Sequence, residues 1–258
     1  MTPTIVLVHG AWHYPAHYRN LTSALSSLGH EVFVPTLLTM NGACPPTSDL
    51  YTDTDHIHSY VESLADTGHK IVVLMHSYGG QVGTNALDKL DVQSRKAQNL
   101  PGGVVRLIYL CAMAFEEGGS MYKITAAVGR AQNLLAAMDI NEDGTAMYRN
   151  AGERMLGPYS GLSKDEVEAY TNSLGVWNVK GMYGELMRCA WREIPVSYVK
   201  VLQDLVMPTP YQTRMIEVMR AAGREVEVFE LDTGHSPQTT MTQEVTEIVH
   251  GIVCRVEE

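Results

Sequence analysis

The chain has 258 residues, of which 45% are apolar and 19% charged, and its formal net charge is −10. This length fits one large α/β domain, and the composition is that of a globular protein able to bury a core. The acidic balance argues against nucleic acid or an anionic membrane surface as a partner, because both require a basic face. No apolar run approaches the roughly 20 residues that span a bilayer, so we expect no membrane anchor.

The first ten residues, "MTPTIVLVHG", enter an apolar strand directly, without a basic segment and a signal-type apolar stretch. The four cysteines are far apart and form no CxxC pair, which favours reduced core thiols and a cytoplasmic location. These cysteines are Cys44, Cys111, Cys189 and Cys254. The sequence does not determine the oligomeric state, and a homodimer remains open.

Apolar, β-branched runs alternate with segments of helical periodicity through most of the chain. Strands are predicted at 5–8, 31–35, 70–75, 104–113, 196–204 and 225–232. Helices are predicted at 21–28, 57–65, 81–90, 211–223 and 239–253. Strands that are apolar on both faces and connected by helices are typical of a mostly parallel sheet flanked by helices. The charge-rich segment 88–100 is interpreted as a solvated loop.

The alternation stops between about residues 115 and 194, a region rich in Met, Ala, Gly and Tyr. Segments 124–139 and 163–174 have helical character, and no convincing strand is present. We therefore predict a single domain over residues 1–258, with a helical cap insertion at about 115–194. Such an insertion tends to cover the carboxyl ends of the strands, where open α/β sheets bind ligands.

The stretch "IVVLMHSYGG" (residues 71–80) ends a predicted buried strand on Ser77, with Gly79 and Gly80 behind it. A serine on a sharp strand-to-helix turn projects its hydroxyl above the sheet, and glycine two places later lets helix and strand pack closely. The amide groups that begin the new helix could stabilise an oxyanion. The usual G-x-S-x-G pattern is broken, however, because Met75 stands where its first glycine belongs. A serine that only caps a helix is the alternative reading.

Three further segments support a catalytic serine. "VLVHGAWH" places His9 and Gly10 at the end of an early strand, where a loop amide could complete an oxyanion hole. "LDTGHSP" places His235 in a turn after a late strand, and Asp204 follows the strand before that one. The order Ser77, Asp204, His235 is the order of nucleophile, acid and base in α/β-hydrolases.

With these motifs the chain resembles the α/β-hydrolase superfamily over nearly its whole length. Within that superfamily it is similar to the small methylesterase and hydroxynitrile-lyase-like group, and to fungal members linked with secondary metabolism. The resemblance implies Ser77 as nucleophile, His235 as general base and acid, and Asp204 as the carboxylate that orients the histidine. It also implies that the backbone N–H groups of Ala11 and Tyr78 form the oxyanion hole. It implies no cofactor and no metal.

Other residues compete for these roles. Asp232 lies three residues before His235 and is the alternative carboxylate, although Asp204 is favoured. His76 is a rival base, but adjacent strand residues point to opposite faces, so we expect it to pack or hydrogen-bond inside the sheet. His9 is expected to brace the oxyanion loop. The pairs His13/His17 and His56/His58 lack the acidic or cysteine partners of a closed zinc site.

The predicted chemistry is cleavage of a small, mostly apolar carboxylic ester or lactone through an acyl-enzyme. Trp12, Trp177 and Met113 are the predicted substrate-binding residues. The lyase branch of the resembled group typically has threonine where this chain has Gly10, and lysine where it has Ser236, so both departures favour hydrolysis. A lyase, a carbon–carbon bond hydrolase and a receptor-like binding homologue remain the alternatives.

Overall fold

The computed structural model describes residues 2–256 and contains the predicted sheet. All six predicted strands form, and every neighbouring pair is parallel, in the order β2-β1-β3-β4-β8-β9. The strands are β1 (Thr4–Val8), β2 (Val32–Phe33), β3 (Lys70–His76), β4 (Gly103–Leu110), β8 (Val196–Val201) and β9 (Val226–Leu231). The predicted α/β-hydrolase fold is therefore confirmed.

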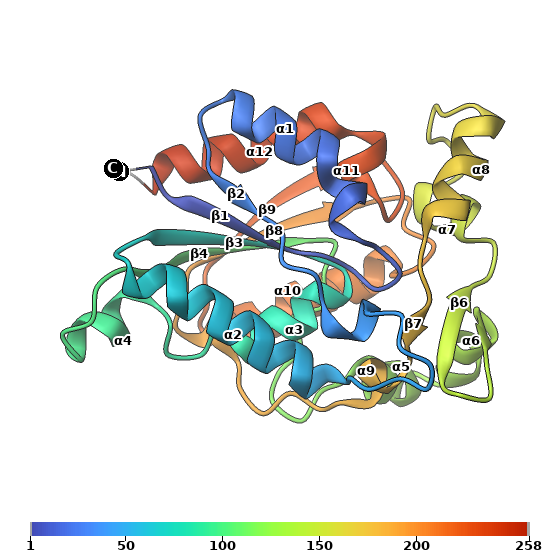
Figure 1. Ribbon diagram of the computed structural model, residues 1–258, viewed down its shortest axis with the longest axis horizontal. Helices are drawn as coiled ribbons and strands as arrows, with labels where there is room; N and C mark the ends of the chain where they lie inside the picture. Colours follow the sequence, from blue (N-terminus) through green and yellow to red (C-terminus); the bar gives the residue numbers. More distant parts are fainter. Residues whose placement is uncertain (1, 257–258) are drawn as a thin grey trace.

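Helices cover both faces of the sheet. α1 (Arg19–Ser27) and α12 (Thr242–Arg255) pack together on one face, while α2 (Leu50–Asp66) and α3 (Tyr78–Ala86) pack together on the other (Figure 1). The remaining helical elements outside the cap are η1 (Pro15–Tyr18), η2 (Leu38–Met40), α4 (Val92–Ala97), η3 (Ala190–Arg192), α10 (Thr209–Ala221) and α11 (Pro237–Thr240). No helix in the described part of the chain is both long and apolar enough to cross a bilayer.

The central strands bring the site segments together. β1 and β3 run side by side in register, with Val8 opposite Met75, so the loops that follow them leave the same edge of the sheet. Residues 5–8 and 71–75 are completely buried, which explains their unbroken apolar character. The segments after His9 and His76 therefore meet above the carboxyl ends of the strands.

The cap is the segment between β4 and β8 in the sequence, and it lies at the carboxyl ends of the strands (Figure 1). Its helices are α5 (Met121–Ala127), α6 (Ala131–Ala136), α7 (Ala151–Leu156), α8 (Lys164–Ser173) and α9 (Lys180–Tyr183). It also contains an antiparallel sheet of β5 (Met138–Ile140), β6 (Thr145–Tyr148) and β7 (Trp177–Asn178). The predicted cap helices are present, but the expectation that this region lacks strands was wrong, because strands of two to four residues are too short to carry a period-two pattern.

Two smaller expectations also need correction. The segment 88–100 is not only a solvated loop, because it contains α4, whose Arg95 is buried and bonds Asp66 at 2.6 Å. Of the four cysteines, Cys111 and Cys189 are buried, but Cys44 is exposed.

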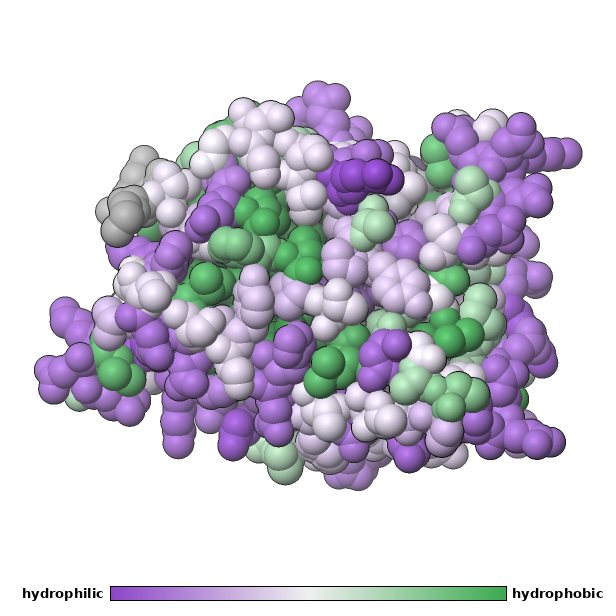
Figure 2. Space-filling view, viewed as in Figure 1, coloured by the Kyte–Doolittle hydropathy of each residue, from purple (hydrophilic) through white to green (hydrophobic). Residues whose placement is uncertain are grey.

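On the face drawn in Figure 2, polar side chains (purple) dominate the outer edges, including the region of α4 and α8.

Candidate active site

Ser77 lies on a strained turn between β3 and α3. Its φ is 53° and its ψ is −123°, a left-handed backbone conformation that non-glycine residues rarely adopt. A Cβ on Gly79 would lie 2.2 Å from the carbonyl oxygen of Val8, and one on Gly80 would lie 2.7 Å from backbone atoms of Met113. Both positions therefore require glycine, because helix and strand backbones approach closely behind the serine.

The broken glycine pattern is accommodated one turn into α3. A Cβ added to Gly83 would lie only 2.3 Å from Sδ of Met75, so the methionine side chain occupies the space above this glycine. The first glycine of the usual pattern is thus replaced by a methionine packed on a glycine six residues after Ser77. Sequence reasoning missed this compensation, although the run of small residues at the start of α3 was its visible signal.

The structure brings the three predicted triad residues together. Nε2 of His235 lies 2.8 Å from Oγ of Ser77, and its Nδ1 lies 2.7 Å from Oδ2 of Asp204. All three side chains are buried. The alternative carboxylate of Asp232 is exposed and instead accepts a hydrogen bond from the side chain of Gln203. The geometry therefore selects Asp204 and provides a continuous path for a proton from serine to histidine.

Besides His235, amide N–H groups hold the carboxylate of Asp204. Its Oδ1 accepts hydrogen bonds from the backbone N–H groups of Val206 at 2.8 Å and Met207 at 2.7 Å. Its Oδ2, which faces the histidine, is also 3.3 Å from Nε2 of Gln212 in α10. These bonds fix the orientation of the carboxylate toward the histidine. Sequence reasoning missed Gln212, whose signal was an uncharged polar residue on the buried face of a helix.

The predicted oxyanion donors are placed on either side of the serine. Ala11 lines the same cavity as Ser77, and Tyr78 is the first residue of α3, where backbone N–H groups have no partner within the helix. Neither of these two N–H groups finds an acceptor among residues 2–256. They are therefore free to bind an oxygen atom of a ligand.

His76 and His9 support the site from inside the protein. His76 is completely buried, and its Nε2 lies 2.8 Å from the backbone oxygen of His235. Burial, reinforced by the neighbouring His235, holds the pKa of His76 well below its ordinary value. Nε2 of His9 accepts a hydrogen bond from the backbone N–H of Leu37. Both rings are thus committed to internal contacts, and neither replaces His235 at the serine.

One cluster in the described residues has metal-ligand composition, formed by His76, Cys111 and His235. Its candidate ligand atoms already have partners: both ring nitrogens of His235 bond Ser77 and Asp204, and the Cys111 thiol faces the backbone oxygen of His235 at 3.3 Å. Burial also raises the pKa of the Cys111 thiol well above its ordinary value, which disfavours the thiolate that a metal requires. The cluster is therefore better explained as part of the hydrogen-bonded site.

A cavity of about 580 Å³ opens onto Ser77 beneath the cap. Trp12 and Met113 line it, as predicted, together with apolar residues of α5, α6 and α10. The placement predicted for Trp177 was wrong: this ring is absent from the lining and completely buried between Trp12 and Tyr78, at centroid distances of 5.1 and 5.0 Å. It supports the cavity wall from behind, because it packs against Trp12, which lines the cavity.

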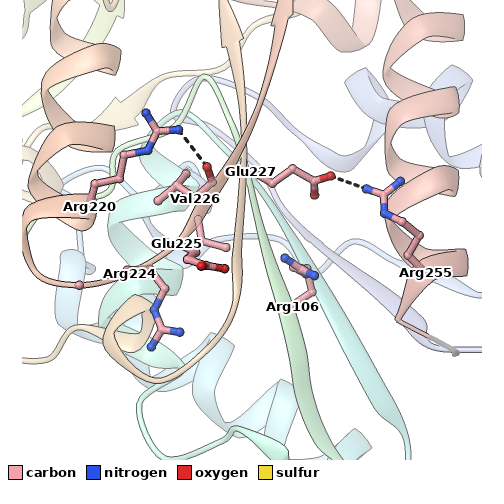
Figure 3. A pocket seen from close by; sticks show the side chains of 9 residues that line it. Arg106, Arg220, Arg224, Glu225, Val226, Glu227 and Arg255 are labelled. Atoms are coloured by element: carbon pink, nitrogen blue, oxygen red, sulfur yellow. Dashed lines mark hydrogen bonds and ion pairs between the residues drawn. The ribbon is translucent and has the colours of Figure 1, made fainter.

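A second cavity, of about 680 Å³, lies at the opposite end of the sheet (Figure 3). Its lining comes from the starts of β4, β8 and β9 and from the ends of α10 and α12. Arg255 bonds Glu227 at 2.7 Å there, and Arg220 donates to the backbone oxygen of Val226. No residue of the triad contributes to this cavity, so it is separate from the chemistry at Ser77.

A serine, a carboxylate and a histidine in this chain order, meeting at the carboxyl edge of a parallel sheet, define the class of serine hydrolases built on the α/β-hydrolase fold. The chain belongs to the alpha/beta hydrolase family, whose sequence pattern matches residues 5–248.

Individual relatives agree with this assignment. The chain is 29% identical over 251 residues to a protein named probable hydrolase R7 from a Phoma species, and the match covers 96% of each chain. It is 32% identical over 117 residues to a carbendazim hydrolyzing esterase from a Nocardioides species, covering 45% of this chain and 44% of the relative. A solved pyrethroid hydrolase from Sphingobium faniae has the same fold, with a TM-score of 0.73, 19% identity and 98% of each chain covered.

Proposed function

We propose that the protein hydrolyses a small, mostly apolar carboxylic ester or lactone through an acyl-enzyme on Ser77. The observation that carries this proposal is the continuous set of contacts from Asp204 through His235 to Ser77, at 2.7 and 2.8 Å. Ser77 also faces a cavity large enough for a small ester, with two free backbone donors beside the serine. Relatives named as hydrolase and esterase support the reaction class.

In the first half of the reaction, Oγ of Ser77 attacks the ester carbonyl while Nε2 of His235 takes its proton. The negative charge that develops on the carbonyl oxygen is bound by the N–H groups of Ala11 and Tyr78. Asp204 keeps the imidazole oriented and stabilises its charged form. The protonated histidine then gives its proton to the leaving alcohol, and the acyl group remains on the serine.

In the second half, water attacks the acyl-enzyme and His235 again acts first as base and then as acid. The carboxylic acid leaves, and the free serine is restored. For a lactone, the alcohol and the acid are two ends of one product.

The surroundings of Gly10 favour hydrolysis over the lyase alternative. A Cβ at this position would lie 3.0 Å from both Cβ of Ser77 and Nδ1 of His76, so the threonine typical of the lyase branch would crowd the site. Ser236, at the position of the lyase lysine, is buried and lies 2.7 Å from the hydroxyl of Tyr170. A role in secondary metabolism, a cytoplasmic location and a homodimer remain predictions.

Steady-state hydrolysis of p-nitrophenyl acetate and butyrate tests the proposal. The wild-type protein should turn over at least one of these esters, and Ser77→Ala and His235→Ala should each lose on the order of 10⁴-fold or more in kcat. Full ester turnover by Ser77→Ala would show that the nucleophile is assigned wrongly. Cyanide release from mandelonitrile without ester turnover would favour the lyase.

A further inference from the structure

The active-site cavity combines an apolar interior with positively charged side chains and lacks acidic ones. Its lining includes three arginines, Arg130, Arg154 and Arg214, and no aspartate or glutamate. This is unexpected in a chain of net charge −10, which has 29 acidic and 19 basic residues. We infer that the substrate carries a carboxylate or a similar anionic group beyond the apolar part that the cavity holds. This inference rests on the proposed ester hydrolysis and specifies its substrate class.

The three arginines come from separate elements that converge on the cavity. Arg130 immediately precedes α6 in the cap, Arg154 lies in α7, and Arg214 lies in α10 of the main domain. They are distant in sequence and share no helix face. The fold, and not a local run of basic residues, therefore places the three charges around one opening.

These arginines are weakly neutralised within the protein. In the described part of the chain, Arg130 and Arg154 form no ion pair, and Arg214 approaches Glu217 only at 3.9 Å, with both side chains largely exposed. Some arginines elsewhere have a close carboxylate: Arg192 lies 2.6 Å from Glu117, and Arg149 lies 2.6 Å from Asp139. At the cavity, no arginine has a carboxylate this close among the described residues.

Polarity also changes with depth. Ser77 and the nearby lining residues Met113, Phe115, Met207 and Met215 are buried, whereas Arg130 and Arg214 are exposed and Arg154 is partly exposed. An ester bound at the serine would thus have apolar surroundings close to the carbonyl and cationic surroundings at its far end. An apolar chain with a terminal carboxylate matches both regions.

Exposed ionic contacts are individually weak, so each arginine should contribute about two- to fivefold to the selection of an anionic substrate. Three together should contribute about tenfold or more. Because the contacts are close to solvent, added salt should weaken them.

The test compares esters that differ only at the far end. Mono-p-nitrophenyl adipate and suberate carry a terminal carboxylate, whereas p-nitrophenyl hexanoate and octanoate have the same chain lengths and end in a methyl group. The kcat/KM ratio of each matched pair is measured for the wild-type protein and for Arg130→Gln/Arg154→Gln/Arg214→Gln. Arg19→Gln, an exposed arginine in α1 that does not line the cavity, is the matched charge control.

We expect the wild-type protein to prefer an acid monoester by about tenfold at low salt, and about 0.5 M salt to reduce this preference. The triple variant should lose about ten times more of its kcat/KM on the acid monoesters than on the neutral esters, mainly through KM. Arg19→Gln should behave as the wild type. The single variants then identify which arginine contributes most.

Two outcomes would count against the inference, and they differ. In the first, the neutral esters are hydrolysed through Ser77, but the ratio of kcat/KM for acid monoester to neutral ester is the same in the wild type and the triple variant. The anionic substrate class is then wrong and the esterase proposal stands. If no ester of either series is hydrolysed in a Ser77-dependent manner, the proposed function fails and the inference fails with it. The neutral-ester rate of the triple variant shows whether that variant is folded.

Discussion

The hydroxyl of Tyr18 lies 2.6 Å from Nδ1 of His76 and accepts a hydrogen bond from the backbone N–H of Gly10 at 3.0 Å. Because this hydroxyl accepts from an amide, its own proton is available to His76 Nδ1. The other ring nitrogen, Nε2, then carries the proton donated to the backbone oxygen of His235. A single buried series of hydrogen bonds therefore connects the oxyanion loop with the turn that carries the catalytic histidine.

Removing this hydroxyl should impair the reaction as well as the stability of the protein. We expect Tyr18→Phe to lower kcat about tenfold or more, because Gly10 and His76 both lose a partner and the oxyanion loop is no longer fixed. Tyr109→Phe is the matched control, since that buried tyrosine bonds Thr84 on the β4 side of α3. Both variants should lose about 1–3 kcal/mol in urea unfolding. A Tyr18→Phe enzyme that loses stability but keeps its kcat would show a merely structural role.

The choice between the two candidate carboxylates can be tested directly. Asp204→Asn should lower kcat by on the order of 10³–10⁴, because the imidazole loses the anion that orients it and stabilises its charge. Asp232→Asn, at the exposed contact with Gln203, should leave kcat within about twofold. Ester hydrolysis by the two purified variants is the measurement. The reverse ranking would transfer the role to Asp232.

The pair formed by Met75 and Gly83 predicts a specific rescue. Gly83→Ala should destabilise the fold by about 1–3 kcal/mol, because its Cβ would overlap Sδ of Met75. Met75→Ala alone should cost about 2–4 kcal/mol through the cavity that it leaves. The double variant should cost less than the sum, by about 1 kcal/mol or more, because the new methyl group occupies vacated space.

Gly79→Ala provides the control for this cycle. A Cβ at position 79 would lie 2.2 Å from the backbone oxygen of Val8 and 2.7 Å from that of His9. These backbone atoms cannot move aside, so Met75→Ala should not rescue Gly79→Ala. Urea unfolding of the five variants gives both comparisons. Simple additivity for Met75 and Gly83 would mean that the methionine is accommodated in another way.

Three buried histidines should make the protein sensitive to mild acid. Burial lowers the pKa of His9 to about 4 and holds the pKa values of His13 and His76 well below their ordinary value. The unfolded chain binds protons at these residues as the pH falls below 6.5, whereas the folded chain does not. Their contribution to stability is therefore complete above about pH 6.5 and is lost as the pH falls toward 4.

For His9 alone this loss is about 3 kcal/mol between these two pH values. Burial raises the pKa of Asp53, so the folded chain binds this proton more readily than the unfolded chain does. At the acidic end of the range this offsets part of the loss of stability caused by the histidines. Urea unfolding at about pH 7.5, 6 and 5 is the measurement. A free energy of unfolding that does not fall between about pH 7.5 and 5 would contradict the assignment of these rings as neutral.

The sequence was most informative where burial imposes an unbroken apolar pattern. The six sheet strands and the sites of Ser77, Asp204 and His235 follow from such runs and from the polar turns after them. The cap strands could not be predicted, because β5 has only one buried residue and β7 is two residues long. The direction of Trp177 and the partnership of Met75 with Gly83 depend on packing between distant elements, which local patterns do not encode.

The most direct test of the account is covalent labelling by diethyl p-nitrophenyl phosphate, followed by mass spectrometry of the intact protein and its peptides. A nucleophilic serine whose hydroxyl faces Nε2 of His235 should take up one diethylphosphoryl group per chain, located on Ser77, with release of p-nitrophenol and loss of ester turnover. Ser77→Ala should remain unlabelled under the same conditions. A label on another residue, or equal labelling of Ser77→Ala, would contradict the account.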